Sequence, residues 1–204
     1  MFFLISIVDY GAGNLQSVVK ALQFIGCDPH ITADRDEILA SDHVILPGVG
    51  SFGDCMDSLR KSHTDQAVID FIDAGKPFLG ICLGMQMLFE GSAESPGVSG
   101  LGVFPGVIRR IPAETGLKIP HMGWNSLKIK KSDGILAGLG ESPYVYFVHS
   151  YYLHADNAEI VSAQTEYGIP IDAAVQFKNV HATQFHPEKS CRTGLQILKN
   201  FVAL

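Results

Sequence analysis

The chain has 204 residues, with 15 Lys and Arg against 21 Asp and Glu, which gives a formal net charge of −6. This length fits one domain, and 47% hydrophobic with 18% charged residues excludes an intrinsically disordered chain. The acidic balance argues against a nucleic-acid binder, since the largest basic cluster is only Lys128, Lys130 and Lys131.

The first residues, Met1 to Val8, are apolar but lack the basic region and the small-residue cleavage site of a signal peptide. No run approaches the roughly 20 apolar residues that a membrane span needs. Without a secretion signal, the cysteines are expected to be free thiols; they are Cys27, Cys55, Cys82 and Cys191. We therefore expect a cytoplasmic protein that does not cross a membrane.

The first half of the chain alternates short apolar runs with helical patterns. Asn14 is a candidate N-cap and Gly26 a candidate stop of the first helix, and Asp34 is a candidate cap of the second. In chain order we expect a strand at 3–8, a helix at 15–25, a strand at 30–32, a helix after Asp34, a strand at 43–46, a helix ending at Gly75 and a strand at 77–81. Strands that are apolar on both faces and alternate with helices predict a parallel sheet covered by helices.

The second half is predicted to contain closely spaced strands, antiparallel in part, followed by a helix. The expected strands are 103–111, 126–129, 144–153, 159–166, 173–177 and 182–185, and the expected helix is 191–201. No linker, repeat or low-complexity tract divides the chain. We therefore predict a single α/β domain over residues 1–204. It is an open, mostly parallel twisted sheet flanked by helices, with an additional antiparallel strand region.

The segment Gly80-Ile81-Cys82-Leu83-Gly84 lies where an apolar strand meets a helical pattern. A glycine two residues before and after a nucleophile is typical of a nucleophile elbow, here with Cys82 in place of serine. The N–H of Leu83 is then placed to stabilise an oxyanion, and the start of the helix favours a thiolate. The alternative is that Cys82 is simply a small buried hydrophobic residue.

A cysteine nucleophile needs a base and a group that orients the base. His186 and Glu188 follow an expected strand, and Pro187 biases His186 towards an extended conformation. Side chains two residues apart on an extended chain project to the same side, so Glu188 can orient the imidazole. A metal site made of His181, His186 and Glu188 does not match a common zinc spacing, so we expect no metal.

A glycine-rich loop, Leu46-Pro47-Gly48-Val49-Gly50-Ser51-Phe52, leaves another expected strand. A backbone N–H of Val49 or Gly50 could supply a second oxyanion donor; the alternative is an ordinary strand-to-helix turn. The loop lacks the lysine of a phosphate-binding loop, and Gln16 stands where a dinucleotide fingerprint needs its third glycine. We therefore expect no nucleotide cofactor.

With Cys82, His186 and Glu188 in this order, the sequence resembles the class I glutamine amidotransferases, whose domain is an open α/β sheet with a Cys-His-Glu triad. Further segments resemble, within that class, the glutaminase subunits of imidazole glycerol phosphate synthases of histidine biosynthesis. These segments are Asp9-Tyr10-Gly11-Ala12-Gly13-Asn14-Leu15, Leu46 to Gly53, Pro120-His121-Met122-Gly123-Trp124-Asn125 and Tyr146-Phe147-Val148-His149-Ser150-Tyr151.

The resemblance implies that Cys82 attacks the side-chain amide of glutamine and that His186 moves the proton. It also implies that Gln86 and Glu94 bind glutamine with help from Gly50, and that no cofactor takes part. Taken alone, Gln86 on a helix is uninformative, and Glu94 in a polar loop is more often solvated.

The resemblance further implies a partner, a (β/α)₈-barrel cyclase that forms a heterodimer with the chain and receives its ammonia. We expect an apolar loop with His121, Trp124 and Asn125 at this interface, together with Asn14; the alternative is that Trp124 belongs to the core. Two other functions remain open. One is the same chemistry with a paralogous synthase and a different ammonia acceptor, and the other is a cysteine hydrolase on a similar scaffold.

Overall fold

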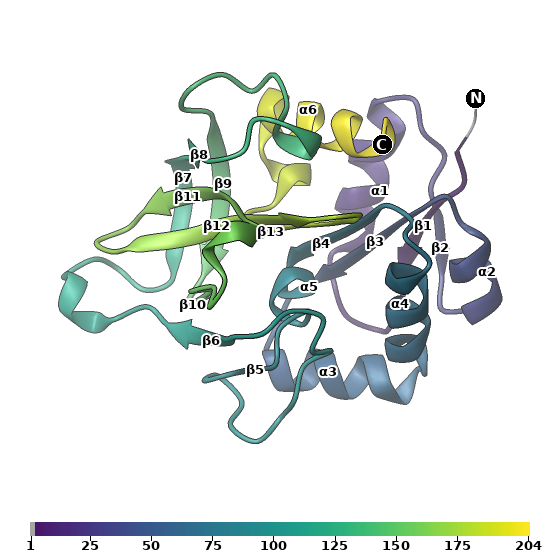
Figure 1. Ribbon diagram of the computed structural model, residues 1–204, viewed down its shortest axis with the longest axis horizontal. Helices are drawn as coiled ribbons and strands as arrows, with labels where there is room; N and C mark the ends of the chain where they lie inside the picture. Colours follow the sequence, from purple (N-terminus) through teal and green to yellow (C-terminus); the bar gives the residue numbers. More distant parts are fainter. Residues whose placement is uncertain (1–2) are drawn as a thin grey trace.

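A computed structural model describes residues 3–204, so Met1 and Phe2 of the apolar first segment lie outside the described residues. Its centre is an eight-stranded sheet in the order β2-β1-β3-β4-β13-β12-β11-β8 (Figure 1). The strands are β1 (Ile5–Val8), β2 (His30–Thr32), β3 (His43–Gly48), β4 (Phe78–Cys82), β8 (Lys128–Ile129), β11 (Val161–Glu166), β12 (Pro170–Phe177) and β13 (Val180–Thr183). Pairing is parallel from β2 to β13 and antiparallel from β13 to β8, which confirms the predicted mixture.

Helices cover both faces of the sheet because its parallel strands are apolar on both faces. Ile7 and Ile45 pack on the side of α1 (Leu15–Phe24) and α6 (Cys191–Val202). Val44 and Leu46 pack on the other side, which is covered by α2 (Arg35–Ala40), α3 (Phe52–Lys61) and α4 (Thr64–Asp73) (Figure 1). None of the helices in the described part of the chain has the length and apolar character needed to cross a bilayer.

The predicted ends of the first helices are confirmed with one exception. The Asp34 carboxylate accepts hydrogen bonds from two backbone N–H groups at the start of α2, and Gly26 has the positive φ of 90° expected just after a helix. Asn14 occupies the N-cap position of α1, but its side chain makes no capping hydrogen bond.

Helix α3 was not predicted, although the sequence carries its signal. Ser51 caps it by accepting a hydrogen bond from the N–H of Asp54. The residues buried on one face recur at helical spacing; they are Phe52, Cys55, Met56 and Leu59. The helix begins directly after the glycine-rich loop and therefore fixes the far end of that loop.

The segment 121–125, expected to be a loop, is instead a strand. It forms β7 (His121–Ser126), which pairs antiparallel with β9 (Tyr144–His149) along its whole length, and this pairing supplies the hydrogen bonds that make it extended. We call this pair the β7–β9 ribbon. It lies at the opposite end of the molecule from α2 (Figure 1).

Several expected strands of the second half are shorter than predicted. Only β6 (Val107–Arg110) forms within 103–111, and the expected strand 144–153 divides into β9 and β10 (Tyr151–Tyr152). A small sheet joins β10, β6 and β5 (Gly91–Ser92). The chain also forms short 3-10 helices, which span Ala113–Thr115, Gly134–Leu136, Ala158–Ile160 and Pro187–Lys189.

Candidate functional site

A cavity of about 310 Å³ opens at the carboxyl ends of the central parallel strands, where open α/β sheets place their ligands. Seven residues singled out in the sequence line it: Val49, Gly50, Cys82, Leu83, Gln86, Glu94 and His186. Val49 and Gly50 follow β3, and His186 follows β13. Cys82 ends β4 and the residues after it form a short helix, while Glu94 follows β5. Thus the tertiary structure brings together residues that the sequence separates widely.

Cys82 lies at a sharp turn between β4 and α5 (Leu83–Gln86). Its φ of 56° and ψ of −109° are unusual for a residue with a side chain, as at a nucleophile elbow. A Cβ atom on Gly84 would lie 1.8 Å from the carbonyl oxygen of Leu46, and one on Gly80 would lie 2.7 Å from that of Gly84. The turn therefore has room only for glycine at both positions, as predicted.

Helix α5 is shorter than the sequence pattern suggested. It spans only four residues, Leu83–Gln86, because the chain then turns away towards β5. The expected helix-dipole effect on Cys82 is correspondingly smaller. The N–H of Leu83 nevertheless stands at the first position of the helix, directly after the cysteine.

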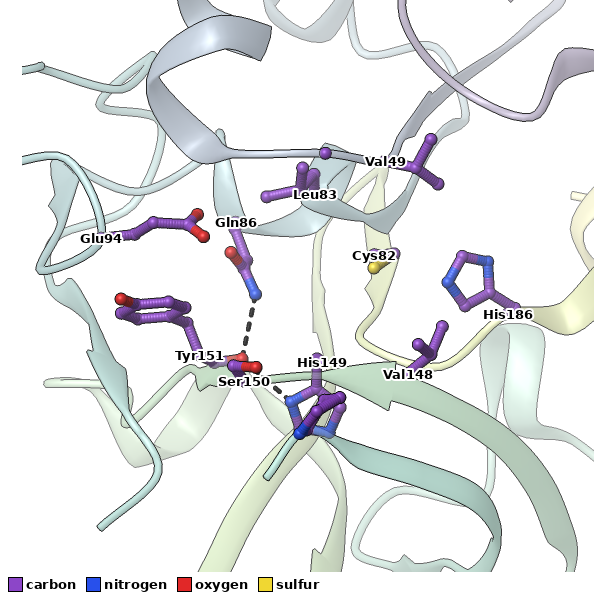
Figure 2. Close-up of a pocket in the computed structure, with 12 residues that line it drawn as sticks. Val49, Cys82, Leu83, Gln86, Glu94, Val148, His149, Ser150, Tyr151 and His186 are labelled. Carbon is purple, nitrogen blue, oxygen red and sulfur yellow. Dashed lines mark hydrogen bonds between the residues drawn. The ribbon is translucent and has the colours of Figure 1, made fainter. Parts of the chain in front are cut away.

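His186 and Glu188 form a buried pair beside Cys82. His186 Nδ1 and Glu188 Oε1 are 2.7 Å apart, and both side chains are at most 2% exposed. The imidazole is turned towards the Cys82 sulfur (Figure 2), and its Nε2 has no hydrogen-bond partner among the described residues. Burial alone would lower the pKa of His186, but Cys82 and Glu188 outweigh burial and raise it to about 9.

Two contacts from neighbouring segments hold the backbone of His186. Its N–H donates to the carbonyl of Tyr146 on β9 (3.0 Å), and its carbonyl accepts from the hydroxyl of Ser190 (2.6 Å). The same Ser190 hydroxyl oxygen accepts from the N–H of Tyr146 (3.0 Å). The β7–β9 ribbon therefore fixes the position of the imidazole through the main chain.

The Val49–Gly50 loop is supported from behind by two buried side chains. The Tyr10 hydroxyl donates to the carbonyl of Pro47 at 2.8 Å, and the Cys55 thiol donates to the carbonyl of Val49 at 3.4 Å. Gly50 has a φ of 113°, which a side chain would strain. The carbonyl of Val49 accepts the hydrogen bond from Cys55. The N–H of Gly50 belongs to the same trans peptide, so it points away from Cys55.

Gln86 and Glu94 enter the cavity opposite His186 (Figure 2). Gln86 is only 2% exposed, and its Nε2 donates to the carbonyl of Tyr151 at 3.1 Å. Glu94 accepts a hydrogen bond from the N–H of Phe52 at 2.8 Å, which ties it to the start of α3. Glu94 is therefore anchored and not the solvated side chain that its loop position suggested.

Five other residues line the cavity without a role predicted from the sequence: Pro120, Val148, His149, Ser150 and Tyr151. They belong to the β7–β9 ribbon or adjoin it. Two of the segments quoted for the resemblance contain them, but no local pattern gives any of them a chemical role.

A hydrogen-bond chain runs through the buried face of this ribbon. Asn125 Nδ2 lies 3.3 Å from His121 Nε2, His121 Nδ1 lies 3.0 Å from His149 Nε2, and His149 Nδ1 lies 2.9 Å from the Tyr151 carbonyl. Burial lowers the pKa of His121 to about 4 and that of His149 to about 3. Both rings are therefore neutral at pH 7. The hydrogen-bond chain requires this, since each ring donates from Nδ1 and accepts at Nε2.

The four residues expected at an interface differ in exposure. Trp124 is 49% exposed, whereas His121 is 3% exposed because its ring stacks between Phe147 and Tyr167 inside the chain. Asn125 and Asn14 are partly exposed. Trp124 is thus a surface residue and does not belong to the core.

Within residues 3–204, no group of three or more His, Cys, Asp or Glu side chains is arranged to hold a metal ion. His181 lies on β13 and is buried; burial lowers its pKa to about 4. A nucleophile elbow, a buried His–Glu pair and a glycine loop around one cavity can support acyl transfer from an amide or an ester.

Residues 6–204 match the family described as glutamine amidotransferase class-I, and the chain therefore belongs to this family. The fold agrees with solved structures. A structure described as a glutamine amidotransferase has a TM-score of 0.76 at 18% identity, with 98% of this chain and 97% of that chain covered. The structure of PurLQS from Thermotoga maritima has a TM-score of 0.78 at 20% identity, with 100% and 99% covered.

Two curated relatives define the branch of the family. One, from Caldanaerobacter subterraneus subsp. tengcongensis, is 52% identical over 97% of each chain, and one, from Methanothermobacter thermautotrophicus, is 49% identical over 98% of each chain. Both are named imidazole glycerol phosphate synthase subunit HisH. Within the class I glutamine amidotransferases, the chain belongs with these subunits.

Proposed function

We propose that the chain is the glutaminase subunit of an imidazole glycerol phosphate synthase and that Cys82 is its nucleophile. One observation carries the assignment of Cys82. The cysteine occupies the strained turn, and the imidazole of His186, which Glu188 holds through Nδ1, is turned towards it (Figure 2). His186 takes the thiol proton, and the sulfur attacks the side-chain amide carbonyl of glutamine. The amide nitrogen then receives the proton from His186 and leaves as ammonia.

The negative oxygen of the tetrahedral intermediate needs hydrogen-bond donors that are already in place. The N–H of Leu83 is one donor, and the Val49–Gly50 loop supplies the other. Each donor of this kind contributes roughly 2.7–4 kcal/mol to the stabilisation of the transition state. A water molecule, deprotonated by His186, then cleaves the thioester to glutamate and restores the thiol.

Gln86 and Glu94 bind the glutamine substrate, with help from the backbone of Gly50. The Glu94 carboxylate suits the α-ammonium group of glutamine, and the Gln86 side chain lies deep in the cavity. Since Phe52 already anchors Glu94, this carboxylate loses little conformational freedom when the substrate binds.

The ammonia passes to a partner subunit, because the relatives are named as subunits of a synthase. We propose that this partner is a (β/α)₈-barrel cyclase in a cytoplasmic heterodimer. It uses the ammonia to make imidazole glycerol phosphate and aminoimidazole carboxamide ribotide in histidine biosynthesis. A different ammonia acceptor would fit the same triad, but relatives about 50% identical over nearly the whole chain favour the histidine pathway.

The exposed face of the β7–β9 ribbon is the proposed partner surface. Met122 and Trp124 are 58% and 49% exposed, and Trp124 lies edge-on to Tyr146. Met122 pairs with Val148, which lines the cavity, so the apolar face is continuous with the wall of the site. A partner bound here would sit next to the cavity in which ammonia is released.

The proposed function is tested by measuring glutamate release from glutamine, first with the chain alone and then with the cyclase subunit and its nucleotide substrate. We expect strong stimulation by the occupied partner and no release by Cys82→Ala in either case. Glutamate release that depends on Cys82 but is not stimulated by the cyclase would contradict the proposal that the cyclase accepts the ammonia. Glutamate release that persists in Cys82→Ala would contradict the assignment of Cys82 as the nucleophile.

A further inference from the structure

Gln184 is a buried polar residue to which the proposed reaction assigns no role. It follows β13, two positions before His186, and is 0% exposed. Its backbone N–H donates to the carbonyl of Ala173 at 2.8 Å, so the main chain fixes its position. The side chain has two partners, Gln86 and Cys82, which are 98 and 102 positions away in the sequence.

The orientation of the Gln184 amide follows from a backbone group. The carbonyl of Tyr151 can only accept, so Gln86 must turn its Nε2 towards it. The second N–H of the same Nε2 donates to Gln184 Oε1 at 2.8 Å. This leaves the Nε2 of Gln184 on the other side, where it donates to the Cys82 sulfur at 3.7 Å.

We propose that Gln184 is a positioning residue that donates a hydrogen bond to the Cys82 sulfur and, through its other amide atom, fixes the orientation of Gln86. The proposal rests on the proposed glutaminase function. A hydrogen bond to a charged group favours the charged form, so the Gln184 amide would stabilise the Cys82 sulfur as a thiolate. It does so without adding a second positive charge next to His186.

The same contact determines what Gln86 offers to the cavity. Both N–H groups of Gln86 are used within the chain, and its Oε1 has no hydrogen-bond partner among the described residues although it is buried. That oxygen is therefore free to accept a hydrogen bond from a donor on a bound ligand. Without Gln184, the Gln86 amide would lose one of the two bonds that hold it in this orientation.

The test compares Gln184→Met, which keeps the length of the side chain but removes both hydrogen bonds, with the wild type. Alkylation of Cys82 by iodoacetamide is followed against pH and resolved by peptide mass spectrometry, because other free thiols are present. We expect alkylation at pH 7 to fall about 10- to 100-fold, with the profile displaced towards higher pH. For glutamine, we expect kcat to fall by a similar factor and KM to rise.

Two further variants keep the result decisive. Gln184→Glu is isosteric and still accepts from Gln86, but it replaces the donor beside the sulfur by a carboxylate; at pH 8 we expect it also to slow Cys82 alkylation. Gln176→Met makes the same substitution on the adjacent strand β12, where the side-chain amide donates to Asp133, outside the site. This control should leave the alkylation profile unchanged.

Alkylation does not require turnover, so it separates this proposal from the proposed function. A wild type that releases no glutamate, together with a displaced Gln184→Met profile, would overturn the glutaminase function and keep the contact with Cys82. A folded Gln184→Met or Gln184→Glu variant with the wild-type alkylation profile would overturn the role of Gln184. If Gln184→Met does not fold, the alkylation profile of Gln184→Glu alone decides whether Gln184 positions Cys82.

Discussion

At the scale of single residues, the site depends on backbone positions where a side chain does not fit. The backbone of Gly84 lies so close to the carbonyl of Leu46 that no side chain fits there. The tight turn from β4 into α5 depends on this glycine. In the same turn Cys82 has a positive φ of 56°, and it lines the cavity. The strain at Cys82 is therefore maintained by packing around its neighbours.

We expect Gly84→Ala to lower the free energy of unfolding by at least about 3 kcal/mol, because the new Cβ would meet the carbonyl of Leu46 at 1.8 Å. Urea denaturation measures the loss. Gly91→Ala is the control, since its Cβ would have its nearest contact, the Val98 carbonyl, at 3.4 Å. Equal stability of Gly84→Ala and the wild type would show that the turn is less tight than described.

At the scale of elements, the β7–β9 ribbon has two faces with different roles. The inward face carries the neutral pair His121 and His149, and the outward face carries Met122 and Trp124. Alternation along a strand explains this division, since successive side chains point to opposite sides. The ribbon also holds His186 through the carbonyl of Tyr146, so it joins the proposed partner surface to the proposed base.

We expect Trp124→Ala to weaken binding of the cyclase subunit about 30-fold or more, as for an aromatic residue at the centre of an interface. Calorimetric titration measures the affinity. Thermal unfolding of the chain alone should change little, because Trp124 is already 49% exposed. Phe177→Ala is the matched control, since Phe177 is 46% exposed but lies at the end of β12; unchanged binding by Trp124→Ala would place the interface elsewhere.

At the scale of the whole molecule, buried histidines link stability to pH. Burial lowers the pKa of His121, His149 and His181 to about 4, 3 and 4, whereas Cys82 and Glu188 outweigh burial and raise that of His186 to about 9. For the first three, the unfolded chain binds protons below about pH 6.5 while the folded chain stays neutral, so stability falls as pH decreases. For His186 the sign is opposite, and its contribution is lost as pH rises through about 9.

We expect the free energy of unfolding to be highest near pH 7 and to fall by on the order of 1–2 kcal/mol per buried neutral histidine at pH 5. Most carboxylates remain ionised at pH 5, so the histidines dominate this change. Urea titrations at pH 5, 7 and 9 measure it. His121→Phe, which keeps an aromatic ring in the stack, should reduce the loss at pH 5; a stability that is flat from pH 7 to pH 5 would contradict the assignment.

The sequence alone determined most of the sheet and the position of the site. Apolar strands alternating with helices predicted the parallel part, and the glycines around Cys82 predicted the turn, because such patterns report the local backbone conformation. The pair His186 and Glu188 was also predicted, but its expected extended geometry was wrong. Only His186 is extended, and Glu188 lies in the 3-10 helix Pro187–Lys189, where its carboxylate meets His186 Nδ1. Helix α3 was missed, although its cap and its apolar face are visible in the sequence.

The contacts that join distant segments follow from the tertiary fold alone. The strand β7 exists because β9 pairs with it, and the histidine pair forms across that pairing between residues 28 positions apart. The contacts of Gln184 span about 100 positions. No local pattern encodes such contacts, because a hydrogen bond across the sheet depends on where two separately folded segments meet and not on the residues beside either of them.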